Sequence, residues 1–451
     1  MSGATLALFG LVRLIFNAVG VRIFGAEYVG VVGAAQSTSS IAAVLLAAVP
    51  SVLGTRFVSQ HRGAGEAERA ARLFTAVLVA TIVLAGAATA AFAWTGSPAG
   101  APVLAVYVLF FSLYLLFKAT YFAFGMSRAY ARAEGAGFVA FLVTFGVACA
   151  LRSTTAATLS TLAHPAVVVL SGCWDHRAHW RPQGAWSELA RDGKGYAGFA
   201  LSTLANALNG LASYHLLLVL ASRQLDAEST GHLSVLLSAL SPFSLLPTAF
   251  GSAAFPELSR RFGGGDHVGM TRLMRRSTIV LQGVILVAMT PFFFLSGALL
   301  PLLGLPADVG LETTWSWILL ALLLNCISAP AGHYLNASEH VHKHAVLSVL
   351  TLAIGTWVGL GALTRYGIVG AGIMRWAVDG TMAWARIALA EIVSPWMSGA
   401  RSWLLAGHAL LLAIFVTSVL LRQTAWGVGL WFAATAIQVA LGSRVLAASR
   451  A

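Results

Sequence analysis

The chain has 451 residues, of which 58% are hydrophobic and only 10% are charged, and its mean hydropathy is +0.81. A soluble domain carries about 25% charged residues, so this composition excludes an ordinary soluble protein and indicates an integral membrane protein. The net charge is +12. Because the basic residues gather in loops on one side, we assign this charge to contacts with anionic membrane lipids and expect no nucleic-acid partner.

Fourteen apolar stretches follow one another along the chain, most of them near the length of about 20 residues that a membrane-spanning helix needs. Lipid offers no hydrogen-bond partner to open backbone groups, so the predicted fold class is all-α. The stretches are residues 4–24, 31–55, 74–94, 103–124, 135–151, 156–172, 196–221, 233–255, 278–303, 314–333, 345–363, 369–389, 403–421 and 426–441.

Lysine and arginine are unevenly distributed between the loops on the two sides of these spans. With the N-terminus in the cytoplasm, the cytoplasmic loops and tail carry nineteen basic residues and the outer loops carry five. This is the positive-inside pattern. We therefore expect a multi-pass protein of the plasma (inner) membrane with both termini in the cytoplasm.

The first span carries Arg13 near its middle and Asn17 one turn later. A charge at the bilayer centre costs about 2.5–3.5 kcal/mol on insertion scales, so it usually faces a cavity or a partner. Arginine stays charged, and its planar fork matches phosphate oxygens. We interpret Arg13, with Asn17, as part of an anion-binding cavity; the alternative is an arginine that only packs against another helix.

Three further basic residues are candidates for substrate binding. Lys118 lies deep in the fourth span, where it either faces the cavity or extends to the cytoplasmic surface. Arg56 and Arg260 lie at the cytoplasmic ends of the second and eighth spans. They are either ordinary anchors or parts of a basic ring at the cavity mouth.

The seventh span carries several polar residues. Asn206 and Asn209 are one turn apart, so both can face the cavity or form hydrogen bonds between helices. We assign Tyr214 and His215 to interhelical hydrogen bonding.

Arg375, Asp379 and Arg386 share the twelfth span at helical spacing. Arg375 and Asp379 are i,i+4 neighbours and can pair, which predicts a structural or gating ion pair, with proton coupling through Asp379 as the alternative. Asp379 is the only carboxylate that we expect to be buried. No catalytic or metal-binding motif is found, so we expect no enzyme, no metal and no cofactor, and leave H+ or Na+ open as a coupling cation.

The sequence repeats itself at a spacing of about 200 residues. Residues 22–30 return as 223–231, with Arg, Ala, Glu and Gly in register at a shift of 201, and residues 62–66 return as 262–266 at a shift of 200. Six spans separate the equivalents, so both halves have the same orientation and the pseudo-twofold axis runs along the membrane normal.

This repeat predicts two six-helix lobes facing a central cavity. The N-terminal lobe covers residues 1–172, a cytoplasmic linker covers 173–195, and the C-terminal lobe covers 196–391. Residues 392–451 hold two additional transmembrane helices and a short tail.

Three segments resemble a known group of transporters. The Arg13 span with residues 22–30 resembles the start of bacterial polysaccharide flippases. Residues 255–260, which read Phe-Pro-Glu-Leu-Ser-Arg and precede a Gly-Asp pair, resemble the corresponding segment of those proteins and of the peptidoglycan lipid-precursor flippases. Residues 338–372 resemble their eleventh-span region. The chain is thereby identified as a member of the multidrug/oligosaccharidyl-lipid/polysaccharide exporter superfamily.

The resemblance implies a transporter that flips polyprenyl-diphosphate-linked oligosaccharide, a precursor of O-antigen, capsule or exopolysaccharide, by alternating access from the inner to the outer leaflet. Arg13 matches the first-span arginine of that pattern, and Arg260 matches the basic residue after Pro-Glu-Leu-Ser. The implied partners are the lipid-linked oligosaccharide and membrane lipids, with polysaccharide polymerase machinery as a further candidate.

Several alternatives stay open. The lipid-precursor branch usually shows more basic residues near the start of the second span, whereas this chain has only Arg56 at its far end. A multidrug exporter of the same superfamily often carries an acidic residue in the first span, where this chain has Arg13. A membrane glycosyltransferase or polymerase would want a long outer loop, and every predicted outer loop is short.

Overall fold

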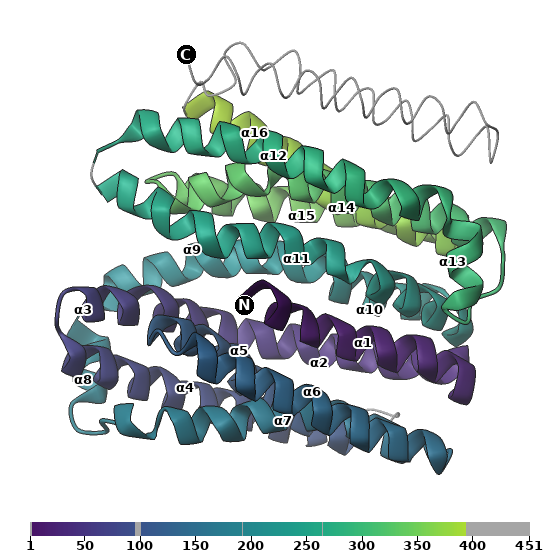
Figure 1. Ribbon diagram of the computed structural model, residues 1–451, viewed down its shortest axis with the longest axis horizontal. Coiled ribbons are helices and arrows are strands. Elements are labelled where there is room, and N and C mark those ends of the chain that lie inside the picture. The colour runs from purple at the N-terminus through teal and green to yellow at the C-terminus, as the bar shows by residue number, and fades with distance from the viewer. Residues whose placement is uncertain (1, 95–100, 192, 264, 394–451) are drawn as a thin grey trace. The chain divides into compact units, whose positions relative to one another are not determined.

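The computed structural model describes residues 2–94, 101–191, 193–263 and 265–393. Within these ranges the chain is helical and contains no β-strand (Figure 1). Each of the first twelve predicted spans falls on helix, and the ninth continues past Phe294 into a second short helix. The all-α prediction is confirmed, while the predicted spans 403–421 and 426–441 lie outside the described residues.

The helices also have the composition of membrane spans. Eight described helices are long and apolar enough to cross a membrane, judged by length and composition. They include the fifth and sixth predicted spans, although Pro165 lies inside the sixth. The chain is a polytopic membrane protein.

By compactness the chain divides into two units, Met1–Ser238 and Ala239–Ala451. The division falls inside α11 (Ala227–Gly263), so the first unit contains every helix before α11 and the start of α11 itself. This division reflects compactness, whereas the lobes were predicted from a sequence repeat. It therefore does not test the lobes, and the predicted boundary at residues 173–195 stays a prediction.

In the first unit, α2 lies against most of the other long helices. It contacts α1, α4, α5, α9 and α10, while α6 and α7 form a closely packed pair beside α5 and α1 (Figure 1). The elements are α1 (Ser2–Phe24), α2 (Ala26–Leu53), η1 (Gly54–Val58), α3 (Ser59–Gly63), α4 (Ala67–Trp94), α5 (Ala101–Ala123), α6 (Ser127–Ala150), α7 (Thr154–Asp175), η2 (Arg177–His179), α8 (Ala185–Arg191), α9 (Gly193–Leu211), η3 (Ala212–Leu216) and α10 (Leu217–Gln224).

The first unit also contains the first pair of repeated glycines. A Cβ atom added to Gly30 would lie 1.9 Å from the carbonyl oxygen of Ala227, and one added to Gly231 would lie 1.9 Å from the carbonyl oxygen of Ala26. Only glycine allows two helix backbones to approach this closely. Each glycine thus lies against the residue that the shift of 201 relates to the partner of the other glycine. A twofold axis between the starts of α2 and α11 would produce this reciprocal contact.

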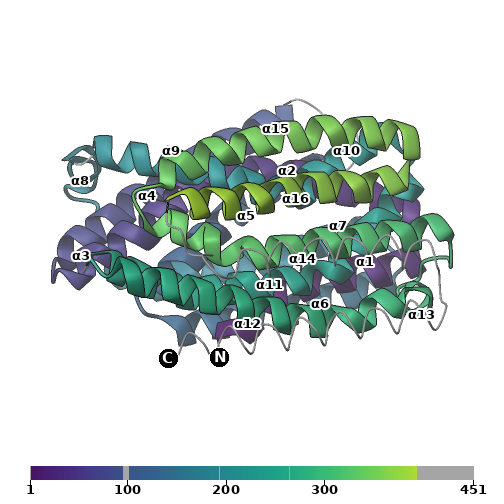
Figure 2. The ribbon, with the colours of Figure 1, turned by 90° about the horizontal axis from the view of Figure 1, so that it is seen from above.

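The second unit is arranged around α14 (Val309–Ala337), which packs between α12 (His267–Phe294) and α16 (Ile368–Val393). The apolar part of α14 is 89% buried, which accounts for a helix that is hydrophobic on all sides. The short helix α13 (Ser296–Leu302) follows α12, and α15 (Val341–Tyr366) lies along α16 (Figure 2).

Candidate functional site

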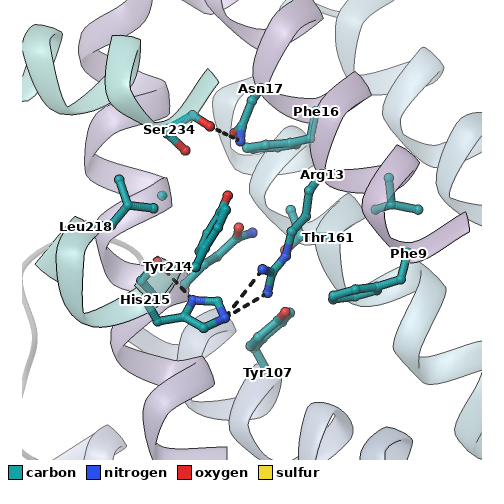
Figure 3. Close-up of a pocket in the computed structure, with 14 residues that line it drawn as sticks. Phe9, Arg13, Phe16, Asn17, Tyr107, Thr161, Tyr214, His215, Leu218 and Ser234 are labelled. Carbon is teal, nitrogen blue, oxygen red and sulfur yellow. Dashed lines mark hydrogen bonds between the residues drawn. The ribbon is translucent and has the colours of Figure 1, made fainter. Parts of the chain in front are cut away.

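Arg13 lies in a cavity of the first unit. The space between atoms there measures about 450 Å³, part of it open to solvent. Figure 3 shows side chains from α1, α5, α7, η3 and α11 converging on it. The aromatic rings of Phe9 and Tyr107 line one part of the cavity, and Asn17 and Ser234 line another.

The π-helical turn η3 brings two neighbouring side chains to this cavity. Tyr214 and His215 both line it, although they are adjacent in sequence. In a regular helix, neighbours point in directions about 100° apart, and π-turns are often found at functional sites. The seventh span therefore contributes a phenol and an imidazole to one arginine.

The hydrogen bonds of Arg13 fix the protonation of His215. Both Nη1 and Nη2 of Arg13 lie 3.4 Å from Nε2 of His215. A guanidinium can only donate, so Nε2 accepts and the ring proton lies on Nδ1, which donates to the Ser37 hydroxyl at 3.2 Å. His215 is thus held as a neutral acceptor that orients Arg13, as inferred from the hydrogen-bond pattern.

The charge of Arg13 is surrounded by neutral groups. Its Cζ lies 4.8 Å from the ring centre of Phe9 and 5.1 Å from that of Tyr214, and Nη2 donates to the Ser40 hydroxyl at 3.5 Å. Within the described residues, no carboxylate pairs with it. Cation–π contacts stabilise a desolvated cation by about 2 kcal/mol but do not neutralise it, so the cavity can attract an anion.

Asn17 lines the cavity, but its amide group also joins helices. Its Nδ2 donates to the backbone oxygen of Ser234 at 3.2 Å and to the hydroxyl of Ser238 at 2.5 Å. The hydroxyl of Tyr214 lies 2.9 Å from the same Ser238 oxygen. This amide therefore fixes α1 to the start of α11, and substrate contact by Asn17 stays a prediction.

Among the other predicted binding residues, the structure describes the side chain of Lys118 alone. Lys118 on α5 is half-buried and interacts electrostatically with Glu134 rather than lining the cavity. The side chains of Arg56, Asn206, Asn209 and Arg260 lie outside the part of the chain that the structure describes.

In the second unit, the predicted gating residues differ in their hydrogen-bond partners. Nε of Arg375 donates to Oδ2 of Asp379 at 2.7 Å, and both side chains are buried. Arg386 donates instead to Nε2 of His344 at 3.2 Å and to Oδ1 of Asn325 at 3.1 Å. Arg375 and Asp379 thus form an ion pair, and Arg386 interacts electrostatically with Asp379 while its hydrogen bonds go to His344 and Asn325.

The expectation that Asp379 is the only buried carboxylate is wrong. Glu134 is fully buried, and Glu188 is 3% exposed. The apolar run that marks the fifth span begins at residue 135, whereas α6 begins two turns earlier at Ser127. Glu134 therefore lies inside the helix bundle, where polar groups of neighbouring helices compensate for the loss of water.

The comparisons with known proteins agree with this architecture. No family model and no curated protein matches the chain. A lipid II flippase, MurJ, in an inward closed conformation aligns with a TM-score of 0.65 and 9% identity, over 99% of this chain and 98% of that one. An inward-facing multidrug resistance MATE family transporter of the MOP superfamily aligns at 0.56 and 13%, over 85% and 99%.

A third solved structure is an aspartate-to-asparagine variant of the Vibrio cholerae MATE transporter VcmN. It aligns with a TM-score of 0.52 and 16% identity, over 89% of this chain and 98% of that one. At such identities the likeness is one of fold. The chain therefore has the fold of the multidrug/oligosaccharidyl-lipid/polysaccharide (MOP) superfamily of transporters, as its sequence segments implied.

Proposed function

We propose that this protein flips a polyprenyl-diphosphate-linked oligosaccharide from the inner to the outer leaflet of the plasma membrane by alternating access. The diphosphate binds at Arg13, and the sugars lie among the polar and aromatic side chains of the cavity. Both termini lie in the cytoplasm. Coupling to H+, Na+ or the membrane potential belongs to the same proposal.

The observation that carries this proposal is an arginine in a membrane-embedded cavity that has no carboxylate partner among the described residues. A charge inside a bilayer is costly and usually marks a substrate or ion path. Arg13 is oriented by a neutral histidine and flanked by two aromatic rings, and a guanidinium fork suits phosphate oxygens. A cationic drug would be repelled by this site, so the cavity favours an anionic headgroup over a multidrug substrate.

A second candidate is a peptidoglycan lipid-precursor flippase. The alignment with the lipid II flippase MurJ covers nearly the whole chain. A peptidoglycan lipid precursor would present the Arg13 cavity with the same diphosphate group as a lipid-linked oligosaccharide. A membrane glycosyltransferase gains no support, since the compared structures are transporters. The two flippase candidates differ only in the glycan, which direct identification of the transported lipid distinguishes.

The proposal is tested by reconstituting the protein in liposomes with a fluorescent polyprenyl-diphosphate sugar and measuring its access to an outside quencher. Arg13→Ala is expected to lower transport at least about 30-fold, because removing one partner of a buried charged contact costs about 2 kcal/mol or more. Arg22→Ala, on the exposed end of the same helix, is the matched control. Full transport by Arg13→Ala at equal protein density would contradict the assignment.

A further inference from the structure

Glu134 is the centre of a second polar cluster in the first unit. Its Oε1 accepts hydrogen bonds from the hydroxyls of Tyr114 at 2.9 Å and Tyr130 at 2.5 Å. Its Oε2 lies 2.9 Å from Nε2 of His164, and neither side chain of this pair has any exposed area. Three helices, α5, α6 and α7, thus surround one carboxylate with hydrogen-bond donors.

The surroundings of this carboxylate suit a proton better than a metal ion. Sodium, calcium and similar hard cations need several oxygen lone pairs directed at them. Here the hydroxyls of Tyr114 and Tyr130 and the ring nitrogen of His164 direct hydrogens at Glu134 instead. Within the described residues, no group of three or more potential ligands is placed to hold a metal.

The pair has room for one additional proton. With Nε2–H of His164 donating to Glu134, Nδ1 of His164 is buried and has no hydrogen-bond partner in the part of the chain that the structure describes. In that state the pair carries a net charge of minus one. A proton added to Nδ1 or to the carboxylate makes the pair neutral, so no other reactant is required. Lys118 on α5 also interacts electrostatically with Glu134.

One aromatic ring separates this pair from the cavity. The ring of Phe9 lies 5.3 Å from that of Tyr114 and 5.6 Å from that of His164, while the guanidinium of Arg13 lies 4.8 Å from Phe9 on the cavity side. Arg13 and His164 are therefore at most about 10 Å apart. At the effective dielectric constant of about 20 that describes charges in proteins, a unit charge at this distance changes a proton equilibrium about tenfold.

We propose that Glu134 and His164 form a proton-binding site whose occupancy is linked to the charge at Arg13. The positive charge of Arg13 disfavours the added proton, and an anion bound to Arg13 removes that effect, so the site takes up a proton as the cavity fills. The link to substrate rests on the proposed anion binding at Arg13; the proton site itself does not. The proposal assigns the coupling of proton binding to anion binding to α5, α6 and α7 of the first unit. Glu134 lies between the predicted spans 103–124 and 135–151, where the sequence predicts a loop.

The site is tested without ligand by ¹⁵N-histidine magnetic resonance of the protein in lipid nanodiscs, with the His164 signal identified by its loss in His164→Gln. We expect this signal to change in a single protonation step as the pH is varied. Glu134→Gln is expected to lower the midpoint, because the carboxylate stabilises the added proton. Tyr130→Phe is expected to raise it, because the carboxylate loses a donor. A signal that stays in one state, or that titrates identically in both variants, would show a fixed structural pair and overturn the proposal.

The linkage is also tested without ligand. Arg13→Gln removes the cation and is expected to raise the His164 midpoint by about one pH unit. Glu68→Gln is the matched control, because Glu68 is 69% exposed on α4 and pairs with Arg72. An unchanged midpoint in Arg13→Gln would overturn the linkage.

Farnesyl diphosphate then separates this proposal from the proposed function. It is expected to raise the His164 midpoint of the native protein and to leave that of Arg13→Gln unchanged. Failure of farnesyl diphosphate to bind would count against the transport substrate, while the two ligand-free titrations still decide the proton site. Binding at the Arg13 cavity without a rise in the midpoint would contradict the coupling.

Discussion

Arg13 combines a permanent charge with a neutral partner that fixes its direction. The two guanidinium nitrogens share the Nε2 atom of His215, whose other nitrogen is held by Ser37. A guanidinium held in this way loses little rotamer freedom when an anion arrives, which favours binding.

Substitution of His215 tests this orienting role. His215→Phe retains a ring of similar shape but removes the acceptor, so binding of farnesyl diphosphate is expected to weaken roughly tenfold, the effect of losing one hydrogen bond to a charged group. His215→Gln offers an acceptor again and is expected to recover most of the affinity. Equal affinity of the native protein and His215→Phe in calorimetry would show that His215 does not orient Arg13.

At the residue scale, the sequence identified the cation but not its surroundings. Arg13 is conspicuous because a charge inside an apolar run is costly. Tyr214 and His215 were visible only as polar residues in a span, because no sequence motif that we used predicts a π-turn such as η3, which contains both. Glu134 was missed because apolar runs mark lipid contact, and α6 extends beyond its apolar run.

Among the elements, the sequence repeat has a structural explanation in its glycines. Gly30 and Gly231 allow the close contact between α2 and α11. Gly65 and Gly265, at the other repeated segment, have φ angles of 79° and 72°, a region that side chains other than glycine rarely enter. The sequence repeat is therefore visible at positions where the backbone geometry favours glycine. The apolar residues between these positions fit lipid in many combinations and show little of the repeat.

Substitution of these contact glycines is expected to destabilise the protein. The Cβ of Gly30→Ala or Gly231→Ala would overlap a carbonyl oxygen of the neighbouring helix, and overpacking of this kind costs about 1–3 kcal/mol. Each variant is expected to lower the thermal unfolding midpoint in detergent. Gly86→Ala, in α4 with no atom within 4 Å of the added Cβ, is the control and is expected to match or exceed the native midpoint.

A polar network at the start of α4 is expected to make stability depend on pH. Nδ1 of His61 lies 2.7 Å from Oε2 of Glu66, and Arg69 donates to the same oxygen at 2.9 Å. The hydrogen bond from His61, followed by that from Arg69, holds the pKa of Glu66 below its usual value. A carboxylate with a lowered pKa stabilises the fold above its unfolded pKa of about 4.3 and loses that contribution as pH falls through the folded value.

Glu66→Gln is therefore expected to lower the thermal unfolding midpoint at about pH 7 and to have little effect below about pH 4. Glu68→Gln, at an exposed position in the first turn of α4, is the comparison. A difference between Glu66→Gln and the native protein that persists unchanged at acid pH would mean that Glu66 does not act through its charge.

For the whole molecule, hydropathy and loop charge were sufficient to predict an all-α polytopic membrane protein, and the resembling segments were needed to predict the superfamily fold. Membrane helices must form all their backbone hydrogen bonds internally and expose apolar side chains to lipid. Their positions can therefore be predicted from runs of apolar residues. Composition does not identify the transported molecule, because sugars are bound by ordinary polar side chains, and only the proposed anion site at Arg13 indicates a chemical class. The identity of the substrate is thus the central claim that remains to be measured.

The most direct measurement is mass spectrometry of polyprenyl-linked lipids from cells with and without the gene, and from deleted cells that express the native protein or Arg13→Ala. The account predicts that a diphosphate-linked oligosaccharide accumulates in the deleted cells, that the native protein removes it, and that Arg13→Ala does not. An unchanged lipid pool, with the surface glycan intact in the deleted cells, would contradict the flippase function.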